Sequence, residues 1–159
     1  MSSSSAWWLL LLCAALAAWY WVRTRKQKRL ATEQADAAPL RALLRLKMDE
    51  CWNEGRLRAG QSSYFESAAN DPNEPPEDVP RQREKALNFE VQGRGMFTLA
   101  NTLEVIIGLT TKNEMVAQME RYADEFRQNM GKETAFEAAI SSVVAQGLDG
   151  VLADIARKH

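Results

Sequence analysis

The side chains that most often carry catalysis are scarce in this sequence. Its single histidine is His159 at the chain end, where a frayed terminus cannot hold the geometry that a general acid or base needs. The best group of carboxylates is Asp49, Glu50 and Glu54, which we expect on a helix surface among basic residues, forming ion pairs in solvent. We therefore predict a non-enzymatic protein. An enzyme with an unfamiliar site would require a deep pocket that gathers several of these acids.

Motifs for metals, cofactors and phosphates are also missing from the sequence. It contains no C-x-x-C, E-x-x-H or EF-hand pattern, and Cys51 beside Glu50 supplies one ligand rather than a site. Residues 93–95, Gly-Arg-Gly, lack the lysine and the strand of a phosphate-binding loop, and they predict a helix break. We expect no metal and no cofactor. We also expect Cys13 and Cys51 to be thiols, which fits a reducing compartment.

An apolar segment near the N-terminus bears on the cellular location of the protein. Residues 6–22 carry no charge, and as a helix they would span roughly 26 Å, near the short end of what crosses a bilayer. Aromatic side chains stand at both ends, where the two membrane interfaces would lie: Trp7 and Trp8, then Trp19, Tyr20 and Trp21. The segment therefore predicts a transmembrane helix.

The charges around this segment predict its orientation. No cation precedes it apart from the amino terminus, whereas five follow it at once, expected to contact the membrane interface: Arg23, Arg25, Lys26, Lys28 and Arg29. Basic residues stay on the cytoplasmic side, so we expect the N-terminus outside and the C-terminal domain in the cytoplasm, at a bacterial inner membrane or an organelle membrane. A signal peptide cleaved after residues 14–18 is the alternative, but it would have its charges before the apolar segment.

The basic segment has two interpretations, and the rest of the chain is acidic. The five cations could bind anionic lipid headgroups, at about 1 kcal/mol per cation near the surface, or they could only fix the orientation. Residues 30–159 carry 15 cations and 21 anions, a net charge of −6. This balance excludes binding to the phosphate backbone of nucleic acids, which requires clustered basic residues.

The first part of the body reads as a spacer followed by amphipathic helices. Residues 23–38 form the basic juxtamembrane segment and a loose spacer, and Pro39 suits the first turn of a helix that reaches about Arg58. A capping box at Ser63 and Glu66 predicts a shorter helix that ends near Asn70, so residues 39–70 form one helical segment. Residues 71–80 hold four prolines and four acids, and they predict a surface linker.

Residues 81–159 have the pattern of a helical bundle. We expect a helix to position 92, a break at residues 93–95, and further helices that begin at the capping boxes of Thr111 and Thr134. Gly147 and Gly150 either allow helices to approach closely, which we favour, or only weaken the end of the last helix. No alternating strand pattern appears in the sequence. The predicted fold class is all-α, with a single N-terminal transmembrane helix followed by a small cytoplasmic helical bundle of about five helices.

One segment resembles a known repeat. In YFESAANDP, Tyr64 stands eight residues before Pro72, which resembles the second helix and exit turn of a tetratricopeptide repeat. The resemblance implies a membrane-tethered, peptide-binding module or co-chaperone with a concave groove. No second copy occurs at the period of about 34 residues that such solenoids need.

The predicted function is that of a membrane-anchored, non-enzymatic adaptor, or of an accessory or assembly subunit of a membrane protein complex. Its partners would be the lipid bilayer and protein subunits of that complex, and a homo-oligomer is possible. We assign partner contact to apolar positions of two amphipathic helices: Leu44, Met48, Trp52, Val144, Leu148 and Val151.

Overall fold

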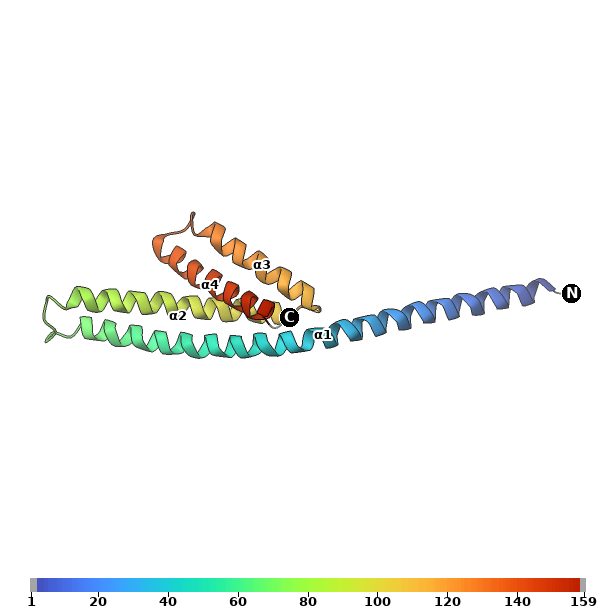
Figure 1. Ribbon diagram of the computed structural model, residues 1–159, viewed down its shortest axis with the longest axis horizontal. Helices are drawn as coiled ribbons and strands as arrows, with labels where there is room; N and C mark the ends of the chain where they lie inside the picture. The colour runs from blue at the N-terminus through green and yellow to red at the C-terminus, as the bar shows by residue number, and fades with distance from the viewer. Residues whose placement is uncertain (1–2, 158–159) are drawn as a thin grey trace.

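The computed structural model describes the backbone of residues 3–157 and the side chains of residues 12–157, and this part of the chain contains four α-helices and no strand. The helices are α1 (Ser3–Ala69), α2 (Val79–Ile107), α3 (Lys112–Asn129) and α4 (Ala135–Arg157). The C-terminal half of α1 pairs with α2, α3 and α4 pack on this pair, and the N-terminal half of α1 extends beyond the bundle (Figure 1). The prediction of an all-α fold is confirmed.

Helix α1 overturns the expected division of the N-terminal half. The anchor, the spacer and the two helices predicted within residues 39–70 form one helix of 67 residues, so the prediction of five helices after the anchor is wrong. The spacer is rich in good helix formers, and Arg29 pairs with Glu33 one turn later, at 3.2 Å. Pro39 lies inside the helix, where it removes the hydrogen bond to the carbonyl of Ala35 without ending the helix.

The predicted break at residues 93–95 is also wrong, because α2 continues through both glycines. A Cβ atom on Gly93 would lie 3.3 Å from the backbone oxygen of Gly55 on α1, and one on Gly95 would lie 2.6 Å from Cγ1 of Val143 on α4. The two glycines are buried at these helix crossings. Their lack of a side chain serves close packing on both sides of α2 rather than a turn in the backbone.

Two other glycines complete this pattern of close contacts. A Cβ on Gly55 would lie 2.6 Å from the ring of Phe97, and one on Gly147 would collide with the side chain of Leu99. Close helix approach at Gly147 is therefore confirmed. At Gly150 the position of the missing side chain is open, so the same prediction is wrong there.

The connections between helices follow the capping chemistry of the sequence. Glu114 N–H donates to Thr111 Oγ1 at 3.2 Å, and Glu137 N–H donates to Thr134 Oγ1 at 3.3 Å, which confirms both helix starts. Residues 70–78 form the connection between α1 and α2, slightly shorter than the predicted linker. The Arg41 guanidinium on α1 donates to the carbonyl oxygens of Leu109 and Thr110, at 2.8 and 2.7 Å. It thereby attaches the α2–α3 turn to α1.

The core lies where the four helices meet. Its largest fully buried side chains are Leu44, Leu103, Ile106, Met115, Met119, Val144 and Leu148. Met115 and Met119 therefore fill the core, whereas Met96 and Met130 are half-buried.

Within the described residues, α4 is the one helix that is long and apolar enough to cross a membrane by length and composition. A core helix passes the same test, and α4 buries Val144, Leu148, Val151 and Ile155 in the bundle. The expected anchor at residues 6–22 falls partly outside the described side chains, which begin at Leu12.

Alanine at two helical glycines should have different effects on stability. Gly60→Ala fills open space and should raise the free energy of unfolding by about 0.5–1 kcal/mol, because glycine is a poor helix former. Gly95→Ala has the same helix gain but must displace the stiff side chain of Val143, which costs about 1–3 kcal/mol. Urea unfolding of the full chain in mild detergent should therefore rank Gly95→Ala below Gly60→Ala. Equal stabilities would contradict the close packing of α2 on α4.

Candidate functional site

The residues predicted to contact a partner lie in the interior of the bundle. Leu44, Val144 and Leu148 have no exposed surface, and Val151 is 5 % exposed. Met48 and Trp52 are half-buried and pack against the same core. All six side chains therefore contact the chain's own helices. Amphipathic spacing identified the buried face correctly, but it did not reveal that the same chain covers that face.

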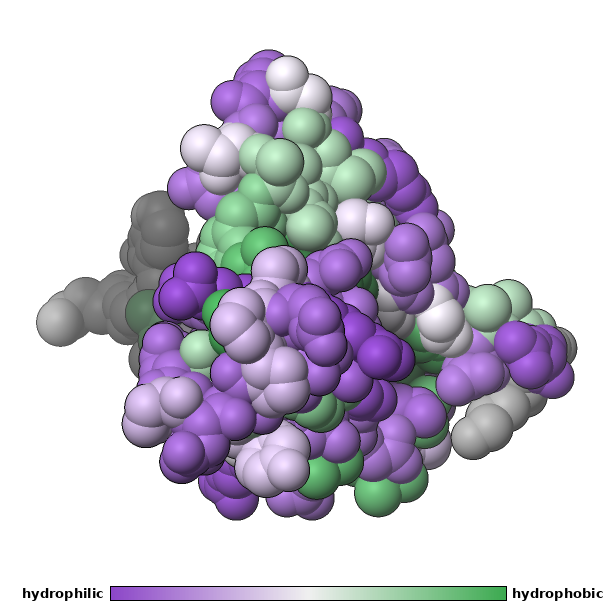
Figure 2. Space-filling view, turned by 90° about the vertical axis from the view of Figure 1, so that its left-hand side faces the viewer, coloured by the Kyte–Doolittle hydropathy of each residue, from purple (hydrophilic) through white to green (hydrophobic). Residues whose placement is uncertain are grey.

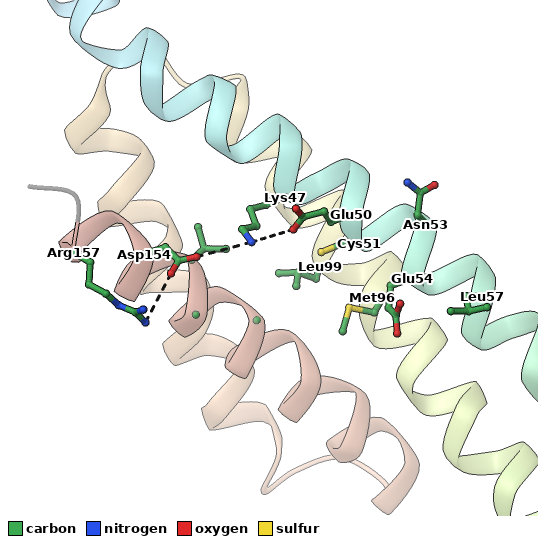
Figure 3. Close-up of a pocket in the computed structure, with 13 residues that line it drawn as sticks. Lys47, Glu50, Cys51, Asn53, Glu54, Leu57, Met96, Leu99, Asp154 and Arg157 are labelled. Carbon is green, nitrogen blue, oxygen red and sulfur yellow. Dashed lines mark hydrogen bonds and ion pairs between the residues drawn. The ribbon is translucent and has the colours of Figure 1, made fainter.

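A groove with a volume of about 730 Å³ lies beside α1, α2 and α4. Its apolar lining comes from all three helices, and polar groups of α1 and α4 stand along its edges (Figure 3). The lining residues that matter for its chemistry are Cys51, Leu57, Met96, Leu99, Gly150 and Val151. Leu57 is 55 % exposed, so a large apolar side chain of the groove faces solvent.

The groove exists because α1 and α4 diverge on either side of α2. Leu99 packs against Gly147 at the floor, which brings α4 onto α2, whereas α1 and α4 make few direct contacts. Gly150, one turn after Gly147, leaves open space where a side chain would stand. The groove can therefore hold an apolar group beside Leu99 and Gly150.

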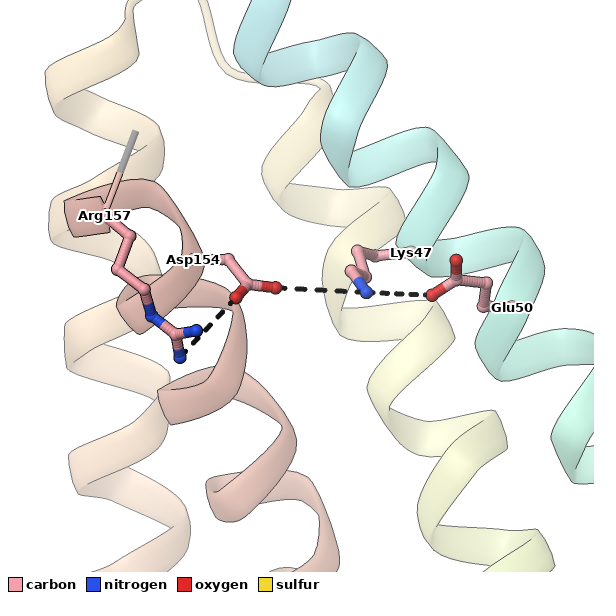
Figure 4. Close-up of polar contacts among 4 residues, drawn as sticks. All are labelled: Lys47, Glu50, Asp154 and Arg157. Atoms are coloured by element: carbon pink, nitrogen blue, oxygen red, sulfur yellow. Dashed lines mark hydrogen bonds and ion pairs between the residues drawn. The ribbon is translucent and has the colours of Figure 1, made fainter. Parts of the chain in front are cut away.

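A chain of charges connects α1 to α4 at one end of the groove. Lys47 Nζ lies 3.0 Å from Glu50 Oε2 on its own helix and 3.9 Å from Asp154 Oδ2 on α4 (Figure 4). Arg157 continues the chain, 3.8 Å from Asp154. The hydrogen bond and the charge of Glu50 raise the pKa of Lys47, so this lysine stays protonated at neutral pH. Its contribution to stability is lost only as the pH rises through that raised pKa.

The groove collects some of the carboxylates that the sequence singled out. Glu50 and Glu54 line it and Asp49 does not, while Asp154 joins them from α4. Sequence reasoning missed Asp154 because its position opposite α1 depends on how α4 packs. The carboxylate of Glu54 pairs with Arg58 at 2.6 Å, so these acids are compensated by cations. Among the described side chains, no group of three or more histidines, cysteines and acids could hold a metal ion.

Cys51 lies at the floor of this groove. It is a free cysteine, 9 % exposed, and burial raises the pKa of its thiol, with a further increase from the charge of Glu50. The neutral thiol is therefore favoured, and thiols react as nucleophiles only when they ionise. The environment of Cys51 suits an apolar packing residue better than a catalytic one.

A second, shallower depression continues along the outer surface of α1. It measures about 500 Å³ and shares Leu57 with the groove, and its other lining includes Gly60, Tyr64 and Phe65. Tyr64 is exposed here near the end of the long α1, so its segment does not form the short separate helix that the repeat resemblance implies. The end of the molecule with the α1–α2 connection is mainly hydrophilic (Figure 2).

Several apolar side chains in the N-terminal half of α1 are exposed. Leu12, Leu16 and the residues from Trp19 to Val22 are each more than half exposed. Trp7 and Trp8, the other predicted interface residues, lie outside the described side chains. All five predicted basic interface residues are exposed on the following turns of the helix.

Comparison with known proteins adds no relationship: no family model matches the chain, and no curated protein or solved structure is significantly similar to it.

The thiol of Cys51 should react slowly in the folded protein. In a Cys13→Ser variant, iodoacetamide at pH 8 should alkylate Cys51 about tenfold or more slowly than in the urea-unfolded chain, because burial disfavours the thiolate and restricts access. The rate should rise as the pH increases beyond the usual range of a thiol pKa. Mass spectrometry of timed samples measures it. Equal rates in the folded and unfolded chains at pH 8 would indicate an activated thiolate and would favour an enzyme.

Proposed function

We propose that the chain is a membrane-anchored, non-enzymatic docking protein, an adaptor or accessory subunit of a membrane complex. Residues 6–22 cross the bilayer with the N-terminus outside, and the helical bundle lies on the cytoplasmic side. The observation that carries the docking role is the groove beside α1, α2 and α4, with the exposed Leu57 and the open position at Gly150.

The exposed apolar turns of α1 support the anchor. Burying apolar surface stabilises a protein by roughly 25 cal/mol per Å². Between Leu12 and Val22, α1 exposes six large apolar or aromatic side chains with no helix packed over them: Leu12, Leu16, Trp19, Tyr20, Trp21 and Val22. A hydrocarbon layer would cover all sides of such a helix at once. Helix α4 is a weaker candidate, because Val144, Leu148, Val151 and Ile155 are buried in the bundle.

The shape of the groove supports a helical partner. Residues 47–57 of α1 form its edge, a length of roughly 15 Å, which matches about three turns of a docked helix. Apolar residues at the floor and ion-paired charges at the edges suit an amphipathic helix that inserts its apolar face. The partner we propose is therefore a segment of another subunit of the same membrane complex.

The continuous α1 sets the position of this docking site. The groove begins 25 residues beyond Val22, so it lies roughly 40 Å along the helix from the end of the proposed span. A partner subunit would need a cytoplasmic segment that reaches this distance from the membrane.

The anchor predicts that the full apolar segment remains in the mature protein. Mass spectrometry of the purified protein should find the residues before position 22, and the protein should stay in the membrane after alkaline carbonate extraction. Protease added outside intact cells should spare the bundle. A mature chain that starts beyond residue 22, or digestion of the bundle from outside, would overturn the anchor and its orientation.

Filling the groove should block docking without unfolding the bundle. With a photo-reactive residue in place of Leu57, Gly150→Trp should reduce the yield of the cross-linked partner at least about fivefold, equivalent to about 1 kcal/mol of binding free energy. Ala117→Trp, an exposed position on α3, is the matched control and should leave the yield unchanged.

The mass of the cross-linked product distinguishes the possible partners. A product with another membrane subunit supports the proposal. A product of twice the chain mass indicates a homo-oligomer instead. If Leu57 gives no more product than the same photo-reactive residue at position 117, the groove is not a docking site.

A further inference from the structure

The five cations after the proposed span are spread over more than half of the circumference of α1. Successive residues of an α-helix are rotated by about 100°, so cations spaced by one to three positions face different directions. The five are exposed and occupy about 10 Å of helix length: Arg23, Arg25, Lys26, Lys28 and Arg29. We call them the basic ring. A site for a protein partner would be confined to one side of a helix, whereas lipid surrounds a transmembrane helix.

Two tryptophans place the basic ring at the depth of the lipid headgroups. The guanidinium carbon of Arg25 lies 3.6 Å from the ring centroid of Trp21, and that of Arg23 lies 5.1 Å from the ring centroid of Trp19. Indole rings prefer the boundary between hydrocarbon and headgroups. A guanidinium stacked on an indole face keeps its N–H groups available at its edge, where they can donate to phosphate oxygens.

The acidic part of the chain does not cancel this attraction. Residues 30–159 carry a net charge of −6, but the bundle begins near Ala37, roughly 12 Å of helix beyond Arg29. At physiological ionic strength, charges are screened over about 8 Å. Arg29 itself also pairs with Glu33, yet its side chain remains 83 % exposed. The membrane surface therefore meets the basic ring before it meets the acids of the bundle.

We propose that the basic ring binds the phosphate groups of anionic phospholipids in the cytoplasmic leaflet, so that the protein gathers a shell of anionic lipid around α1. This inference rests on the proposed membrane anchor. It adds a lipid class to the partners of the chain, and it makes the ring a binding site as well as a signal for orientation.

The test uses the full chain reconstituted into vesicles of phosphatidylcholine with one tenth phosphatidylglycerol. Native mass spectrometry then measures the phosphatidylglycerol among the lipids that stay bound after mild detergent extraction. The wild type should enrich it at least about threefold over the bulk, well within the attraction that five cations near an anionic surface supply. The ring variant should show no enrichment: Arg23→Gln, Arg25→Gln, Lys26→Gln, Lys28→Gln and Arg29→Gln.

A second variant removes the same number of cations elsewhere. It neutralises five exposed arginines of the bundle and should retain the wild-type enrichment: Arg45→Gln, Arg56→Gln, Arg81→Gln, Arg83→Gln and Arg121→Gln. Equal enrichment by the ring variant and the wild type would overturn the proposal. Inorganic phosphate at the concentration of the anionic lipid should not remove the bound lipid. If it does, the ring is a site for free phosphate instead.

Flotation of the same vesicles separates this inference from the anchor. If the wild type and the ring variant both float with vesicles of pure phosphatidylcholine, the anchor holds, and the enrichment alone decides the lipid proposal. If the wild type does not float, the anchor fails and the lipid proposal fails with it.

Discussion

Close contact between helices at glycine positions shapes the bundle. Gly93 lets the backbone of α2 approach that of α1, and Gly95 lets Val143 of α4 reach α2 from another side. Interiors of proteins are packed as densely as organic crystals, so a single added carbon at such a crossing has to move a neighbour. Because α2 contacts α1 on one side and α4 on another, it connects these two helices, whereas α3 packs mainly on α4.

The groove follows from the same arrangement. Gly147 and Leu99 bring α4 onto α2 at the floor, and α1 reaches α2 through Gly55 and Gly93, so α1 and α4 are held apart by the helix between them. Lys47 and Asp154 connect their surfaces at one end of this gap. The groove is therefore a result of the backbone packing, and its apolar lining does not depend on a flexible loop.

Local features of the fold could be predicted from the sequence, and helix continuity could not. The side chains of Thr111 and Thr134 cap the next helix within a few residues, so these helix starts were found correctly. The sequence predicts a helix start at Pro39 and a helix break at residues 93–95, because a single sequence does not show which neighbours compensate these residues. Pro39 costs one hydrogen bond in a long helix, and Gly93 and Gly95 gain packing contacts with other helices.

The candidate site was harder to predict for a related reason. Hydrophobic periodicity correctly marked Leu44, Val144 and Leu148 as members of apolar faces, but it cannot distinguish a face that the chain covers from one that awaits a partner. The exposed Leu57 breaks the periodic pattern, and Gly150 has no apolar side chain to contribute. Asp154 enters the site only through the packing of α4 beside α2. These residues are brought together by tertiary structure, and no local pattern connects them.

In the proposed membrane-anchored arrangement, the uninterrupted α1 also fixes the direction in which the groove faces around the membrane normal. Each residue of a helix adds about 100° of rotation and 1.5 Å of height, so the helical segment between Val22 and Leu40 sets both the height and the rotation of the bundle relative to the proposed span. A chain shortened by two residues there would lower the groove by about 3 Å and turn it to nearly the opposite side. Under this proposal, a change in the length of the segment would turn the groove towards different neighbours in the membrane, even if every residue that remained kept its identity.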